Sequence, residues 1–123
     1  MSELGKVRGL GSAKSGTEHF WMQRVTAVAN VPLIIFLIYF ILSHLGAPRA
    51  AVVASIQNPI CAVALSLAMV SILWHMRLGL QVVIEDYVHS EGRKLAALMM
   101  INFATFALGA LALYSILKMS FGQ

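Results

Sequence analysis

Long apolar runs separated by short polar stretches dominate the sequence. Each run is long enough to cross a bilayer as a helix, because ~20 residues with a rise of ~1.5 Å per residue span the hydrocarbon core. The runs lack the alternation of apolar and polar positions that is typical of membrane β-barrels. The pattern therefore predicts an all-α membrane protein with three transmembrane helices, at about residues 24–45, 59–87 and 94–118.

The polar segments between the runs predict how the helices are arranged. Two prolines and a glycine at residues 46–59 favour a turn, and Asn58-Pro59 is a typical helix start. The link at residues 85–94 is short, so the second and third helices are expected to run antiparallel in an up-down-up order. Residues 1–22 are polar and rich in glycine and serine, and we expect a flexible or partner-docked tail within a single domain, residues 1–123.

Composition places the chain in the membrane class and excludes several other classes. Of the 123 residues 59% are apolar, and the mean hydropathy is +0.81. The single Cys61 excludes an internal disulfide and a cysteine-built zinc site, and packing is the role we expect for it. A cleaved signal peptide is not expected, because the polar start is long and the first apolar run exceeds the usual signal length.

The basic residues predict the orientation of the helices rather than a nucleic-acid partner. The net charge is +4, but lysines and arginines flank the apolar runs and form no patch on a soluble module. More of them lie on the side of the N-terminus, which the positive-inside rule assigns to the cytoplasm or the matrix. The residues on that side are Lys6, Arg8, Lys14, Arg24, Arg93 and Lys94, and those on the opposite side are Arg49 and Lys118.

His75 is an ionisable side chain inside the second predicted helix, where it costs several kcal/mol unless it is paired, hydrated or bound to a ligand. Asp86 lies 11 residues later on the same helix face, ~16 Å along the axis. Gly79 lies at i+4 from His75. Because glycine has no side chain, it leaves beside the imidazole the space that a flat macrocycle held by His75 would require. The alternatives are a packing histidine bonded to a backbone carbonyl, and a glycine that only permits close helix packing.

Other polar residues of the spans predict a partner chain. Arg77 lies ~200° around the helix from His75, so it is expected to pair with a partner subunit, a lipid headgroup or water. His44 is the other histidine within a span. Measured from the inner face of the membrane, it lies ~30 Å along the first helix, whereas His75 lies only ~16 Å along the second. The two cannot bind one haem iron, so a second histidine ligand would come from another chain. We expect Glu85 to be solvated at the helix end.

Asp86 and Tyr87 close the second helix at the membrane interface. A tyrosine at this depth is commonly part of the aromatic belt, and this is the interpretation for Tyr39 and Tyr114. A phenol at the mouth of a pocket can also donate a hydrogen bond to a carbonyl oxygen, and a neighbouring carboxylate can hold an arginine in place. Both interpretations of Tyr87 remain open on these grounds.

The spacing H-x3-G-x6-D-Y-V at His75, Gly79, Asp86, Tyr87 and Val88, together with QRVTAV at residues 23–28, resembles the small hydrophobic membrane anchor of succinate dehydrogenase, respiratory complex II. The resemblance implies that His75 is an axial ligand of haem b, with Gly79 packing against the haem and the other histidine ligand coming from a second membrane subunit. It implies that Tyr87 hydrogen-bonds a ubiquinone carbonyl beside Asp86.

The same resemblance implies further residues and partners. Arg24 is expected near the haem propionates and the quinone pocket, and His19 beside them, although His19 is shifted by one residue from the family position relative to Arg24. The expected partners are a second three-helix anchor of the cytochrome b type, an iron-sulfur subunit and a flavoprotein subunit. The expected location is a bacterial inner (plasma) membrane with a cytoplasmic N-terminus, rather than a mitochondrial inner membrane.

Three alternatives to this function remain open. A small ion-coupled transporter would use His75, Glu85 and Asp86 as a proton relay, but it would leave Gly79 and Arg24 without a role. A purely structural anchor would keep the fold without a haem, and His75 argues against it. The anchor of a quinol-dependent fumarate reductase would share the scaffold and run the reaction in reverse.

Overall fold

The described part of the chain is helical. The computed structural model describes residues 3–4 and 13–122, and no strand occurs in these ranges. The helices are α2 (Ala13–Ser43), α3 (Arg49–Ile56), α4 (Pro59–Tyr87) and α5 (Glu91–Ser120). Three of them, α2, α4 and α5, are long and apolar enough to cross a membrane. The predicted all-α fold with three membrane-spanning helices is confirmed.

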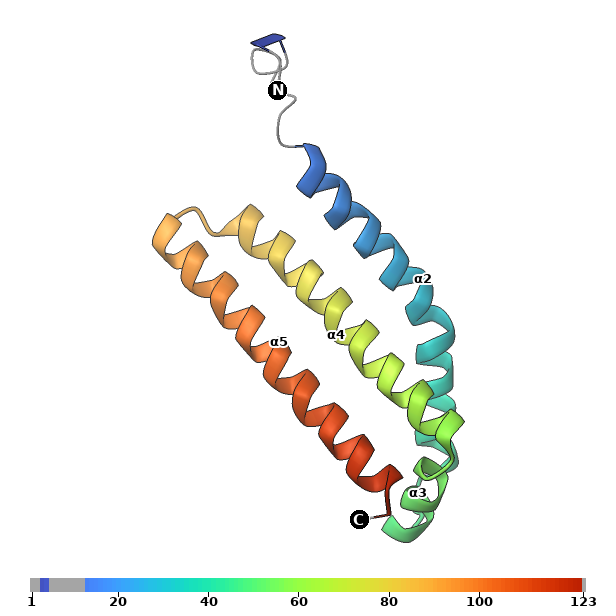
Figure 1. The fold of residues 1–123 in the computed structure, drawn as a ribbon. Coiled ribbons are helices and arrows are strands. Elements are labelled where there is room, and N and C mark those ends of the chain that lie inside the picture. The colour runs from blue at the N-terminus through green and yellow to red at the C-terminus, as the bar shows by residue number, and fades with distance from the viewer. Residues whose placement is uncertain (1–2, 5–12, 123) are drawn as a thin grey trace.

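Helix α2 extends well before the predicted start of the first span. Residues 13–22 are helical where a tail was expected, because no proline precedes Pro32 and the stretch contains no strong helix breaker apart from Gly16. The rest of the predicted tail lies largely outside the described residues, and so do Lys6 and Arg8 of the orientation argument. The helix bends near its middle (Figure 1), where Pro32 removes one backbone hydrogen bond.

The link between α2 and α4 contains a short helix that the sequence did not predict. Gly46 adopts a positive φ of 75°, which lets the chain turn after α2, and α3 follows at Arg49. Ile56 of α3 is only 3% exposed and joins the main apolar cluster, whose other buried members are Ala62, Leu65 and Ile116. Because α3 has eight residues, packing rather than its own propensity stabilises it.

Both ends of α4 agree with the predicted positions. The side chain of Asn58 accepts a hydrogen bond from the backbone N–H of Ile60 at 2.9 Å, and Pro59 occupies the first helical turn. At the other end α4 finishes at Tyr87, and α5 begins at Glu91, three residues earlier than predicted. An acidic residue in the first turn favours this early start.

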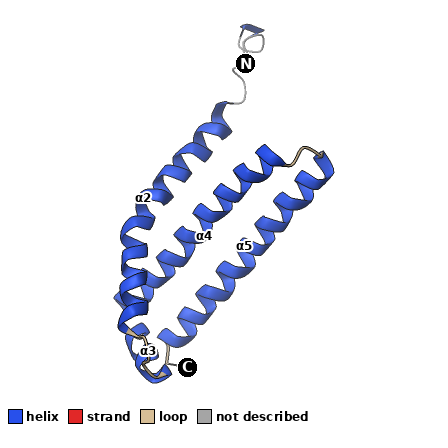
Figure 2. Ribbon diagram, turned by 180° about the vertical axis from the view of Figure 1, so that it is seen from behind, coloured by secondary structure: helices blue, strands red, loops and turns tan. Residues whose placement is uncertain are grey.

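Helix α4 lies between α2 and α5 and packs against both (Figures 1 and 2). The start of α2 and the link between α4 and α5 lie at one end of the molecule, and α3 and the C-terminus lie at the other (Figure 1). This confirms the up-down-up order. The helices form a single layer, so most of their large apolar side chains are exposed and the main apolar cluster lies near α3.

Candidate functional site

A hydrogen bond between α2 and α4 holds His75. Its Nδ1 lies 2.9 Å from Oγ1 of Thr26, a residue that is only 6% exposed. The Thr26 hydroxyl has one hydrogen, and its strongest acceptor is the backbone carbonyl of Met22 at 2.7 Å. We therefore assign a hydrogen to the imidazole Nδ1, which donates to Thr26. This tautomer leaves the lone pair of Nε2 available to a ligand, which is how protein histidines bind metal ions.

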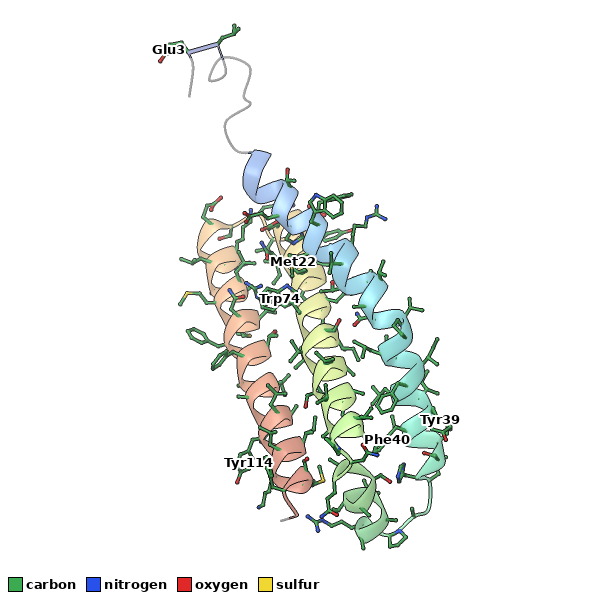
Figure 3. All side chains as sticks on the ribbon, turned by 45° about the vertical axis from the view of Figure 1, so that its right-hand side comes forward. Glu3, Met22, Tyr39, Phe40, Trp74 and Tyr114 are labelled. Carbon is green, nitrogen blue, oxygen red and sulfur yellow. The ribbon has the colours of Figure 1, made fainter. Side chains whose placement is uncertain are left out.

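A second hydrogen bond between the same helices sets their register. Ser71 donates to Oδ1 of Asn30 at 2.7 Å, and Asn30 is 8% exposed. Thr26 and Asn30 are four residues apart on α2, and Ser71 and His75 are four residues apart on α4. The two hydrogen bonds therefore lie one helical turn apart on the same interface. His75 is therefore level with Thr26, two residues from Arg24. The side chains of Met22 and Trp74 lie in this upper part of the bundle, whereas Tyr39, Phe40 and Tyr114 lie lower (Figure 3).

A groove of about 430 Å³ opens beside His75. Three of the predicted site residues, His75, Arg24 and His19, line it together. The other lining residues are Gly16, Phe20, Gln23, Ala27 and Val82. The structure thus brings together on one side of α2 and α4 three of the four residues expected around a haem, and the fourth, Gly79, does not line the groove.

Two polar atoms of this groove have no hydrogen-bond partner in the described part of the chain. They are Nε2 of His19 and Oε1 of Gln23, and both are buried. A buried polar atom without a partner costs ~1–3 kcal/mol, so these atoms indicate a polar group that the described residues do not supply. Sequence reasoning assigned no role to Gln23 or Thr26, although both lie in the QRVTAV stretch.

Gly79 leaves the face of α4 near His75 open. A Cβ atom at this position would meet no atom within 4 Å, so Gly79 is not required for close packing within this chain. Arg24 is exposed, and its guanidinium lies 5.0 Å from the ring centroid of Phe20. An available imidazole nitrogen, an open helix face and a cation at the rim fit one side of a haem with acidic propionates.

Asp86 and Tyr87 do not line the groove of His75. Both are exposed at the end of α4, and Tyr87 is 77% exposed. Their distance along the helix from His75 is ~16–18 Å. The groove extends along α4 to Val82, five residues or ~7.5 Å before Tyr87, so a quinone site at Tyr87 would adjoin the end of the groove, and its remaining walls would come from other chains.

The other ionisable residues of the spans have local roles. His44 lies at the opposite end of the molecule, where its Nε2 is 2.7 Å from Oγ of Ser55 and ties the end of α2 to α3. Glu85 is exposed and accepts a hydrogen bond from Gln81 at 3.0 Å. The described residues contain no group of three His, Cys, Asp or Glu side chains that could hold a bare metal ion. A proton relay across the membrane gains no support from these positions.

Comparisons with known proteins identify the family. The family model of the succinate dehydrogenase/fumarate reductase transmembrane subunit matches residues 2–109. This range contains every site residue predicted from the sequence. No solved structure matches the chain.

Three similar proteins carry related names. The succinate dehydrogenase hydrophobic membrane anchor subunit of Rickettsia bellii is 38% identical over 87 residues, which cover 71% of this chain and 70% of that protein. The subunit of the same name from Paracoccus denitrificans is 30% identical over 116 residues, which cover 94% of this chain and 89% of that protein. The succinate dehydrogenase membrane anchor subunit of Reclinomonas americana is 32% identical over 92 residues, which cover 72% of this chain and 77% of that protein. The chain therefore belongs to the family of succinate dehydrogenase/fumarate reductase transmembrane subunits.

Proposed function

We propose that the chain is the membrane anchor subunit of a succinate dehydrogenase, that it binds haem b together with a second membrane subunit, and that it forms part of a ubiquinone site. The observation that carries the haem proposal is the hydrogen bond from His75 to Thr26, which leaves Nε2 available at an open groove. The names of the similar proteins favour succinate dehydrogenase over a fumarate reductase.

Six residues in or beside the groove have a defined part in this proposal. His75 would hold the haem iron through Nε2, and Thr26 would hold its ring in the tautomer that leaves Nε2 available. Gly79 would leave room for the flat macrocycle, and Arg24 would stabilise the negative charge of the propionates. His19 and Gln23 offer the two polar atoms that lack partners among residues 3–4 and 13–122. When bound, the haem would supply a one-electron redox centre at the level of His75.

Tyr87 and Asp86 are the residues we assign to the quinone. The Tyr87 hydroxyl would donate a hydrogen bond to a quinone carbonyl, whose oxygen gains negative charge as the quinone is reduced. This contribution is electrostatic, because the phenol stabilises developing charge and forms no covalent bond. The exposure of Tyr87 supports a site that is completed by partner subunits.

The single layer of helices supports the proposed assembly. Exposed apolar side chains on α2 and α4 would pack against a second anchor subunit of the cytochrome b type, and lipid would cover the rest. The iron-sulfur and flavoprotein subunits would dock at the end that carries Tyr87. The positive-inside rule places this end and the N-terminus in the cytoplasm of a bacterium, with the helices in its inner membrane.

A reduced-minus-oxidised optical spectrum of the purified complex tests the haem proposal. We expect a b-type band in the wild type that is lost or shifted in His75→Ala. His89→Ala is the matched control, since His89 is exposed in the link before α5 and lies outside the groove. An unchanged band in His75→Ala would refute ligation by His75. The absence of a b-type band in the wild type would refute haem binding and favour a purely structural anchor.

A further inference from the structure

A second groove lies on the other side of α4, between α4 and α5. Its volume is about 590 Å³. One end carries a polar cluster in which Nε of Arg77 donates to Oδ1 of Asn102 at 2.5 Å, and the guanidinium lies 5.3 Å from the ring centroid of Trp74. The rest of the lining is mostly apolar and consists of Val70, Leu73, Thr105, Phe106, Gly109, Ala110 and Leu113.

The charge of Arg77 is not neutralised by the residues around it. The groove contains no carboxylate, and Asn102 supplies a neutral oxygen to one guanidinium nitrogen. No hydrogen bond joins the two terminal nitrogens to another described residue. A guanidinium is suited to bind the oxygens of a phosphate or carboxylate through two parallel hydrogen bonds. An anion from outside this chain is therefore expected at Arg77.

Arg77 lies in the half of α4 that is nearer to the N-terminal side of the membrane. The two hydrogen bonds between α2 and α4 put Arg77 level with Arg24. Arg77 is the first charged residue that follows the uncharged stretch at residues 59–76 of α4, and this stretch is ~27 Å long. The candidate span runs on to Tyr87, ten residues or ~15 Å beyond Arg77, so Arg77 lies within the leaflet on the side of the N-terminus, and its long side chain can extend toward the headgroups.

The groove changes from polar to apolar with increasing depth in the membrane. Thr105 lies three residues beyond Asn102 on α5, ~4.5 Å deeper, and its hydroxyl is buried with no partner in the described residues. Apolar side chains of both helices line the groove beyond it. Gly109 adds no side-chain bulk to this deeper part, and a Cβ at this position would lie 3.6 Å from the side chain of Leu73, in ordinary van der Waals contact.

We propose that this groove binds one phospholipid of the leaflet on the N-terminal side. The phosphate binds Arg77 beside Asn102, an ester carbonyl accepts a hydrogen bond from Thr105, and an acyl chain lies along the apolar part. The order of cation, hydroxyl donor and apolar trough along the groove matches the order of phosphate, ester and acyl chain in the lipid. The proposal concerns the face of α4 opposite His75, so it does not depend on haem binding.

Photo-crosslinking from Phe106 tests the proposal in the complex that purifies with this chain. Phe106 lines the groove and is 79% exposed, so a photoreactive benzoylphenylalanine at position 106 reports what occupies the groove. We expect irradiation of membranes to give a phospholipid adduct, identified by its mass. An adduct with another protein subunit, with a second copy of this chain or with quinone would overturn the proposal.

Variants of the polar cluster show whether the phosphate is recognised. We expect Arg77→Gln to reduce the phospholipid adduct about tenfold, because a charge-assisted hydrogen bond is lost. Arg49→Gln, which changes an exposed arginine at the opposite end of the molecule, should leave the adduct unchanged. Thr105→Val keeps the side-chain shape and should also reduce the adduct. Equal adduct yields in all these variants would show that acyl chains enter the groove without recognition of the phosphate, and would refute the proposed site.

Discussion

At the scale of single residues, Thr26 determines which nitrogen of His75 faces the groove. The Thr26 hydroxyl donates to the backbone of its own helix and accepts from the imidazole, so one small side chain joins α2 to the proposed haem ligand. Partners of this kind orient metal-binding histidines and affect the affinity for the metal, although they do not contact it. Thr26 is therefore a positioning residue for the proposed haem site.

Thr26→Val should weaken haem retention without unfolding the chain, because valine keeps the shape and removes the acceptor of the imidazole N–H. Loss of such a partner typically lowers affinity ~10–100-fold. The measurement is the rate of haem transfer from the purified complex to an excess of apomyoglobin. Thr26→Ser keeps the hydroxyl and should release haem at nearly the wild-type rate. Equal rates for the valine variant and the wild type would exclude the positioning role.

Residues close in sequence were predicted more fully than residues that meet through the fold. The spacing from His75 to Gly79 depends only on helix geometry, and the open face at Gly79 agrees with it. The contact of Thr26 with His75 joins positions 49 residues apart, and no local pattern indicates it. Tyr87 lies outside the groove because α4 continues for five residues, ~7.5 Å, beyond Val82, which is the last residue of α4 that lines it.

At the scale of secondary-structure elements, polar contacts fix how α2 packs against α4. Apolar side chains give little specificity in lipid, because lipid tails are as apolar as the helices, whereas hydrogen bonds between helices define their register. Asn30 with Ser71 and Thr26 with His75 form such a pair of contacts. The upper half of this interface therefore depends on polar side chains, and the apolar cluster near α3 stabilises the lower half.

Asn30→Ala should lower the stability of the α2–α4 packing by ~1 kcal/mol, since interhelical hydrogen bonds in membranes contribute ~0.6 kcal/mol on average and up to ~1.7 kcal/mol. The measurement is unfolding of the purified complex in mixed micelles of increasing denaturing detergent. Ser115→Ala is the control, because its hydroxyl bonds only the carbonyl of Leu111 in its own helix. If Asn30→Ala and Ser71→Ala destabilise additively in the double variant, the two residues are not coupled.

The elements themselves were predictable to different degrees. Hydropathy and length define the three long helices, and the start of α4 follows from the local chemistry of Asn58 and Pro59. Helix α3 was missed because its stability comes from burial of Ile56 and from the contact of His44 with Ser55, which depend on the folded chain. The helical residues 13–22 were missed because a polar composition was interpreted as a tail.

At the scale of the whole molecule, α4 separates two grooves with different chemistry. The groove toward α2 contains His75 and polar atoms that lack partners, and the groove toward α5 contains Arg77 above an apolar trough. The expected ~200° between His75 and Arg77 around α4 explains why they face opposite sides. One layer of helices can thus present a cofactor to a partner subunit on one side and bind lipid on the other.

The proposed orientation predicts which links are accessible from each side of the membrane. Cys61 is the only cysteine, so Cys61→Ser gives a background in which single cysteines report their location. With the N-terminus inside, Arg49→Cys should react with a membrane-impermeant maleimide in intact spheroplasts, because α3 lies at the opposite end of the molecule from the α4–α5 link. Ser90→Cys, in that link, should react only after the membrane is opened. The reverse pattern would place Tyr87 on the outer side, where the proposed docking of the soluble subunits and the supply of electrons to a quinone at that end could not occur.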